Sequence, residues 1–179
     1  MSPEPYLLKA MGPDEALSNA AQIAVALAGF AGVVVAFRSG PLHEWSLLDR
    51  YRLWLLLANA LVPLFTCLFG MLLLTIKPMP PAIWHWASAF SALSALAFGL
   101  LSRRHQAHLA RVLINEVGTY RYLFYTIAIL GTAAGLLQVY NAMIPGVFWL
   151  FYLAIVFQLA MGALQFARMV LLPPHTSKP

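Results

Sequence analysis

Charged residues are scarce in this chain of 179 residues, and long stretches contain none. Only 9% of the residues are Asp, Glu, Lys or Arg, against about 25% in a typical soluble domain. Five charge-free apolar runs cover residues 16–37, 53–76, 82–102, 122–144 and 147–167. At about 1.5 Å per residue, each run is long enough to cross a hydrocarbon core about 30 Å thick. The sequence therefore predicts an all-α, polytopic membrane helical bundle of five transmembrane helices, in which residues 1–179 form a single domain.

Groups that perform chemistry are also few. Cys67 is the single cysteine, so a disulfide framework or a cysteine-based metal cluster is excluded. No carboxylate or lysine of a proton relay lies inside a predicted span, and no phosphate-binding loop or nucleophile elbow is present. His105 and His108 lie near Glu116 but among arginines, which is more typical of a solvated basic face than of a metal site. We expect no catalytic residue, no metal and no cofactor, and hence no enzyme.

The net charge of +5 is an orientation signal. If the chain has five spans and its N-terminus is outside, nine of its eleven Lys and Arg residues lie on the cytoplasmic side. This asymmetry predicts an external N-terminus and a cytoplasmic C-terminus. It also accounts for the basic charge without a nucleic acid, so we expect the lipid bilayer and not a nucleic acid as the partner.

Local signals mark the helix ends. Pro13 is followed by Asp14 and Glu15, which favours a helix start because acidic side chains complement the positive end of the helix dipole. Ser46 and Asp49 have the spacing of a capping box and predict the start of the second helix on the cytoplasmic side. Residues 103–118 are amphipathic, so we expect this cytoplasmic segment to extend the third helix.

Small residues recur at helical spacing in three of the runs. The first run has one at every fourth position from Ala20 to Ala36, and the third alternates spacings of four and three from Ser88 to Ser102. Small residues let helix backbones approach closely where lipid supplies no hydrophobic drive. We therefore predict helix-packing positions at Ala24, Ala28, Gly32, Ser88, Gly99, Gly131 and Gly135. The packing is either within the chain or between copies of it.

Uncharged polar residues are the second signal within the runs. An amide without a partner in hydrocarbon costs several kcal/mol, so we expect these side chains to face the bundle interior, a partner or water. The relevant residues are Gln22, Asn59, Gln138, Asn141, Gln158 and Gln165. Their depths predict that Gln22 approaches Gln138 or Asn141, and that Asn59 approaches Gln165. The amides are either interhelical glue or the lining of a narrow polar pathway.

Residues 17–38, LSNAAQIAVALAGFAGVVVAFR, are followed by Trp45 and by the helix start DRYRL at residues 49–53. This pattern resembles a group of small, uncharacterised bacterial inner-membrane proteins over roughly the first third of the chain. The resemblance implies a multi-pass protein of the bacterial inner (plasma) membrane. It implies no activity, cofactor or catalytic residue.

Two functions stay open from the sequence. The first is a non-catalytic membrane subunit or scaffold that packs through small-residue faces against copies of itself or another membrane protein. The second is a channel or passive carrier for a small solute or ion, lined by the Gln and Asn side chains. Amides bonded within the protein favour the first function, and amides around a continuous water-filled path favour the second.

Overall fold

The computed structural model contains five long helices. It describes residues 11–37, 42–76, 78, 82–113 and 120–171, of which 42, 48, 105–113 and 120–127 are described by their backbone alone. The helices are α1 (Pro13–Phe37), α2 (Leu47–Leu74), α3 (Ile83–Leu113), α4 (Tyr120–Met143) and α5 (Phe148–Leu171), with a short 3-10 helix at Leu42–Glu44. Within these ranges no strand is present. The expected all-helical fold is confirmed.

Four of the helices are long and apolar enough to cross a membrane: Pro13–Phe37, Asp49–Leu74, Ile83–Arg104 and Phe148–Leu171. In α4, the part whose side chains are described includes an apolar stretch, Ala128–Met143, that is shorter than a full span. By length and composition the structure is therefore compatible with a membrane helical bundle. The second helix begins at Leu47, six residues before its apolar run, as the Ser46 capping spacing predicts, so its first turns include charged residues.

Two helix ends follow from the residues that form them. The hydroxyl of Ser46 accepts a hydrogen bond from the backbone N–H of Asp49 at 3.1 Å, so the predicted cap of α2 is confirmed. The carboxylate of Asp49 also lies in the first helical turn, where the helix dipole favours negative charge. Helix α3 continues beyond its apolar run to Leu113, as the amphipathic pattern predicted for this part of 103–118. Residues 114–118 lie outside the described residues.

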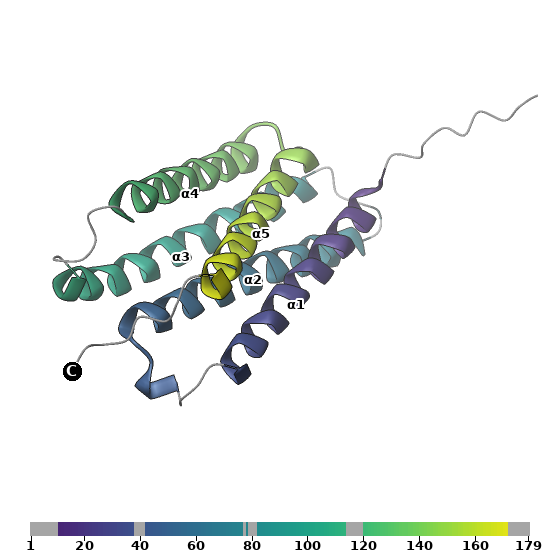
Figure 1. Ribbon diagram of the computed structural model, residues 1–179. Coiled ribbons are helices and arrows are strands. Elements are labelled where there is room, and N and C mark those ends of the chain that lie inside the picture. The colour runs from purple at the N-terminus through teal and green to yellow at the C-terminus, as the bar shows by residue number, and fades with distance from the viewer. Residues whose placement is uncertain (1–10, 38–41, 77, 79–81, 114–119, 172–179) are drawn as a thin grey trace, which may run out of the picture.

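The helices lie in two groups, which meet where α2 packs against α3 and which α5 crosses (Figure 1). Helix α1 packs along α2, α3 packs along α4, and α5 crosses between the groups and contacts all four. The main core lies where α1, α2 and α5 meet, around Leu17, Cys67 and Phe151, each fully buried. Trp84 of α3 packs on the ring of Phe151 with 5.7 Å between ring centroids, which ties the second group to this core.

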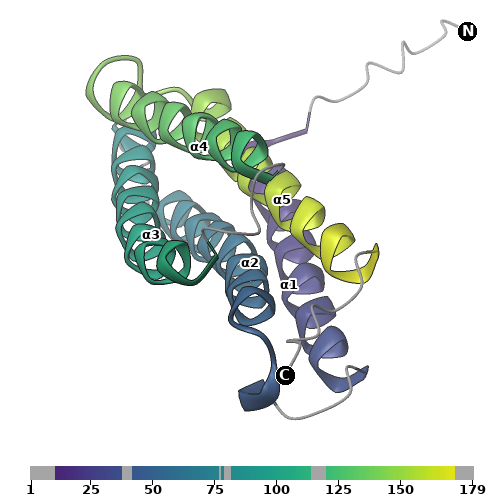
Figure 2. The ribbon, with the colours of Figure 1, turned by 60° about the vertical axis from the view of Figure 1, so that its left-hand side comes forward.

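Helices α3 and α4 do not stay together along their length. They meet next to the α4–α5 turn and separate toward their other ends (Figure 2). A β-carbon built on Gly135 of α4 would lie 3.8 Å from the β-carbon of Ala95 of α3, which is ordinary van der Waals contact. A β-carbon on Gly131, one turn earlier in α4, would meet nothing within 4 Å. Gly135 is therefore a packed position of α4 and Gly131 an open one.

Candidate functional site

The polar residues that the sequence singled out gather at the junction of α3 with the α4–α5 turn. Asn141, at the end of α4, is fully buried and forms three hydrogen bonds. Its Nδ2 donates to the Ser88 hydroxyl at 2.6 Å and to the Val147 carbonyl at 3.0 Å, and its Oδ1 accepts the Val147 N–H at 2.9 Å. One side chain therefore closes the turn between α4 and α5 and attaches it to α3.

His85 completes this junction from the first turn of α3. Its Nδ1 lies 2.9 Å from the carbonyl oxygen of Ala142, and since a carbonyl can only accept, Nδ1 carries the proton. The same ring lies against Gly146, where an added β-carbon would collide with it. Gly146 has a φ of 54°, in the left-handed region, so glycine is required there for both space and conformation. We call His85, Ser88, Asn141 and Gly146 the turn lock.

Gln138 lies one helical turn before Asn141 and is 1% exposed. Its Nε2 donates to the Leu150 carbonyl of α5 at 2.7 Å. Its Oε1 is buried and has no hydrogen-bond partner within the part of the chain that the structure describes. If Nε2 and Oε1 exchanged places, an acceptor would face the Leu150 carbonyl, which needs a donor, and the hydrogen bond to α5 would be lost. Gln138 thus connects α4 to α5 through its Nε2.

The remaining amides do not join this cluster. Gln22 lies on the exposed side of α1, and α1 packs mainly on α2 and α5, so the expectation that Gln22 approaches Gln138 or Asn141 is wrong. Asn59 donates to the Leu55 carbonyl of its own helix at 2.8 Å. The β-carbon of Asn59 faces Gly162 of α5 and would lie 3.5 Å from a β-carbon built on Gly162. Gly162 precedes Gln165, which is buried, by about one helical turn. Gln158 of α5 is partly buried.

The small-residue positions divide into two classes. Ala24 and Ser88 are fully buried, Ala28 packs against the main core and Gly135 faces Ala95. In contrast, a β-carbon on any of three glycines would meet nothing within 4 Å, and all three are exposed: Gly32, Gly99 and Gly131. Of the two alternatives for these glycines, packing within the chain is not seen among the described residues, and packing between copies stays a prediction.

Helix geometry explains why Gly32 lies off the buried side of α1. Residues four apart are about 400° apart around a helix, so a strict every-fourth stripe turns by about 40° at each step. From Ala20 to Gly32 this amounts to about 120°, enough to leave the buried side. The buried side instead continues from Ala24 through Leu27 to Ala31, at spacings that stay on one face.

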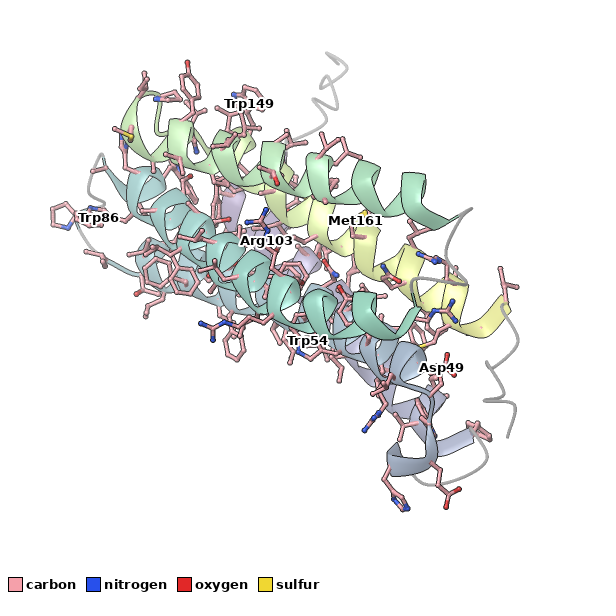
Figure 3. The ribbon with its side chains drawn as sticks, turned by 90° about the vertical axis from the view of Figure 1, so that its left-hand side faces the viewer. Asp49, Trp54, Trp86, Arg103, Trp149 and Met161 are labelled. Carbon is pink, nitrogen blue, oxygen red and sulfur yellow. The ribbon has the colours of Figure 1, made fainter. Side chains whose placement is uncertain are left out.

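A buried ion pair was not predicted from the sequence. Asp49 and Arg52, three residues apart in the first turns of α2, are 3% and 7% exposed, and Nη1 of Arg52 lies 3.4 Å from Oδ1 of Asp49. Figure 3 places Asp49 at the end of the bundle opposite Trp86. Both residues lie before the apolar run at 53–76, in the helix start that the Ser46 capping spacing predicts. The pairing of their side chains and their burial carry no such local signal.

Chemically, this arrangement holds helices together. The polar atoms of Asn141 and the Nε2 of Gln138 are bonded to backbone groups or to another side chain. Among the described residues, no three His, Cys, Asp or Glu side chains lie close enough to hold a metal ion. Comparisons of the chain with protein-family models, with curated proteins and with solved structures find no match.

Proposed function

We propose that this chain is a non-catalytic subunit or scaffold of a membrane assembly, which binds copies of itself or another membrane protein through outward helix faces. The observation that carries the proposal is that the interior amides form hydrogen bonds within the protein. Asn141 and Gln138 bond to backbone groups of the α4–α5 hairpin and to Ser88. Side chains engaged in this way are interhelical glue, which favours the scaffold over an amide-lined pathway.

The outward face of α1 supports the same proposal. Its exposed residues at alternating spacings of four and three are Gln22, Ala26, Gly29, Val33 and Ala36. This spacing follows the seam along which two membrane helices pack, and it lies opposite the buried side of α1. Gly29 leaves open space on it, so a second backbone can approach closely. Gln22, which has an amide at membrane depth, would gain a polar partner there.

We further propose five spans in a bacterial inner membrane, with the N-terminus outside and the C-terminus in the cytoplasm. The distribution of Lys and Arg supports this orientation. The test is cysteine accessibility in a Cys67→Ala background, with new cysteines at His43 and at Met79, which lies outside the described residues. We expect position 43 to be shielded from an external reagent and position 79 to be labelled. The reverse pattern, or labelling of both from one side, would contradict this orientation.

The assembly itself is tested by crosslinking in the native membrane, followed by native mass measurement of the detergent-solubilised complex. We expect a mass larger than one chain of 19.7 kDa. Gly29→Leu on the α1 face should reduce the assembled fraction, because a large side chain blocks close approach. Ala160→Leu, also a small exposed residue but on α5, is the matched control and should leave it unchanged. A monomer with no crosslinked partner would overturn the proposal.

A further inference from the structure

The α4–α5 turn exposes large apolar side chains at one end of the bundle. Met143 and Ile144, at the turn itself, are 76% and 67% exposed, and Trp149, in the first turn of α5, is exposed as well. Trp86, in the first turn of α3, is a further exposed aromatic residue. Figure 3 shows both tryptophans in the half of the bundle that lies away from Asp49. Such side chains are stabilised when they leave water, so the turn requires an apolar cover.

The sequence at the turn carries no charge that would hold it in water. Residues 122–167, which include the turn, contain no Asp, Glu, Lys or Arg, whereas the α2–α3 connection at the same end contains Lys77. The exposed surface continues from Trp149 along α5 to Leu153 and Val156, at spacings of four and three residues that stay on one side of a helix. The apolar surface of the turn is therefore continuous with the outward side of an apolar span.

The N–H groups of the turn are bonded within the protein, as an apolar environment requires. Pro145 has no N–H group. The N–H of Ile144 donates to a carbonyl one turn earlier in α4 at 3.0 Å. The N–H of Gly146 donates to the carbonyl of Asn141 at 2.9 Å, and the N–H of Val147 donates to its Oδ1 at 2.9 Å. Side chains of the turn lock also bond carbonyl oxygens on either side of the turn. No N–H group of residues 144–147 therefore needs water.

The length of α5 places the turn at the edge of the hydrocarbon core. Arg168 lies in the last turn of α5, and a guanidinium stays at or outside the boundary of the apolar core. Trp149 precedes Arg168 by 19 residues, which is about 28 Å of helix and close to the thickness of a core of about 30 Å. Trp149 then lies at the opposite boundary, where tryptophan is enriched, and the turn lies beside it.

We propose that the α4–α5 turn is immersed in the bilayer at the boundary between acyl chains and headgroups, where Met143 and Ile144 contact acyl chains. Asn141 permits this immersion, because its bond to the Val147 N–H removes a group that would otherwise need water. Lipid is favoured over a protein partner in water, because the turn offers neither a charge nor a free N–H group to such a partner and its apolar surface continues along α5. This inference does not rest on the proposed scaffold function.

The experiment measures the depth of position 144 in the whole chain, reconstituted into phosphatidylcholine liposomes. Ile144→Cys in a Cys67→Ala background is labelled with a fluorophore, and the matched control is Pro78→Cys, at an exposed position of the α2–α3 connection at the same end. Iodide on both sides of the bilayer quenches a label in water, and phosphatidylcholine with a nitroxide on its acyl chain quenches a label in lipid. We expect iodide to quench the label at position 144 several-fold less than the label at position 78, and the nitroxide to quench it several-fold more.

A second measurement does not depend on the affinity of the fluorophore for lipid. Before labelling, the thiol at position 144 should react several-fold more slowly with a charged, water-soluble reagent than the thiol at position 78. Equal accessibility of the two positions to iodide or to this reagent would overturn the proposal. Shielding of position 144 from both quenchers would overturn it too, because a second copy of the chain or another protein would then cover the turn.

Two further variants test the role of Asn141. Asn141→Ala and Ser88→Ala both remove the hydrogen bond between the two side chains, but only Asn141→Ala leaves the Val147 N–H without its partner. We expect iodide quenching at position 144 to rise several-fold in Asn141→Ala and to stay unchanged in Ser88→Ala. Equal quenching in the two variants would overturn the role given to Asn141. If Asn141→Ala does not fold, the measurements on the chain with Asn141 in place decide where the turn lies.

Discussion

Asn141 and Ser88 lie 53 positions apart in the sequence, and their side chains meet at 2.6 Å between two helices, in an environment that excludes water from both. The hydrogen bond connects the third helix to the end of the fourth. The same amide bonds both backbone groups of Val147, so a change at Asn141 affects three helices together.

Asn141→Ala is expected to lower the free energy of unfolding by about 1–3 kcal/mol for each buried group that it leaves without a partner. Those groups are the Ser88 hydroxyl and the backbone N–H of Val147. The measurement is equilibrium unfolding in detergent by a denaturant titration. Gln22→Ala removes an amide from an exposed position and should change stability by less than about 0.5 kcal/mol. Similar losses at both positions would contradict the role given to the turn lock.

Gly146→Ala should destabilise the protein through two separate effects. The first is the left-handed backbone at Gly146, which costs a non-glycine residue about 1–2 kcal/mol. The second is the collision of the new methyl group with the His85 ring. A double-mutant cycle with His85→Ala separates them, because removal of the ring relieves only the collision. Additive losses in the two single variants, with no coupling, would show that the ring and the turn are not in contact.

Two glycines provide a comparison of packed and open positions. A β-carbon at Gly70 of α2 would lie 2.9 Å from Cδ1 of Leu17 and 3.3 Å from Cε1 of Phe151, both in the main core. Gly70→Ala should therefore cost about 1–3 kcal/mol through overpacking. Gly32→Ala meets open space and should be neutral or stabilising, because alanine favours the helix. Thermal unfolding of the two variants side by side decides the point. If Gly32→Ala is the more damaging, Gly32 lies in an interface that the single chain does not show.

For the buried ion pair at the start of α2, we expect the removal of one charge to cost more stability than the removal of both. Asp49→Asn leaves Arg52 charged and almost fully buried, which is expected to cost about 3–5 kcal/mol. The double variant Asp49→Leu, Arg52→Met removes both charges and should be the less destabilised of the two. Denaturant titration in detergent measures both. If the stability lost in the double variant equals the sum of the losses in Asp49→Leu and in Arg52→Met alone, the two charges do not interact.

Gln138 separates the two functional interpretations. Gln138→Leu removes one hydrogen bond to Leu150 and also a buried Oε1 without a partner, so we expect a loss of stability below about 1.5 kcal/mol. Solute and ion flux into liposomes containing the protein should be the same for the variant and the original chain. A flux that the original chain supports and the folded variant abolishes would instead establish Gln138 as part of a conduction pathway.

The sequence contains enough information to predict the helices but not their neighbours. The run lengths and the Ser46 cap depend on residues near each other in the chain, and these features are present in the structure. Which side of α1 is buried depends on where Leu17 and Leu27 fit against α2 and α5, and this is a property of the assembled bundle. Because Ala and Gly occur on every side of α1, no stripe in the sequence distinguishes the inner face from the outer. Gln22 was misplaced for this reason.

The turn lock also sets an order of events during synthesis. His85 and Ser88 lie 57 and 53 positions ahead of their partners, so at about 5–20 residues per second they leave the ribosome about 3–10 s earlier. During that interval α3 has its hydroxyl and imidazole groups in place while the helix that binds them has not yet been made. The α4–α5 hairpin is therefore made after the side of α3 that it contacts. The speed of translation through α4 determines how long His85 and Ser88 remain without these partners.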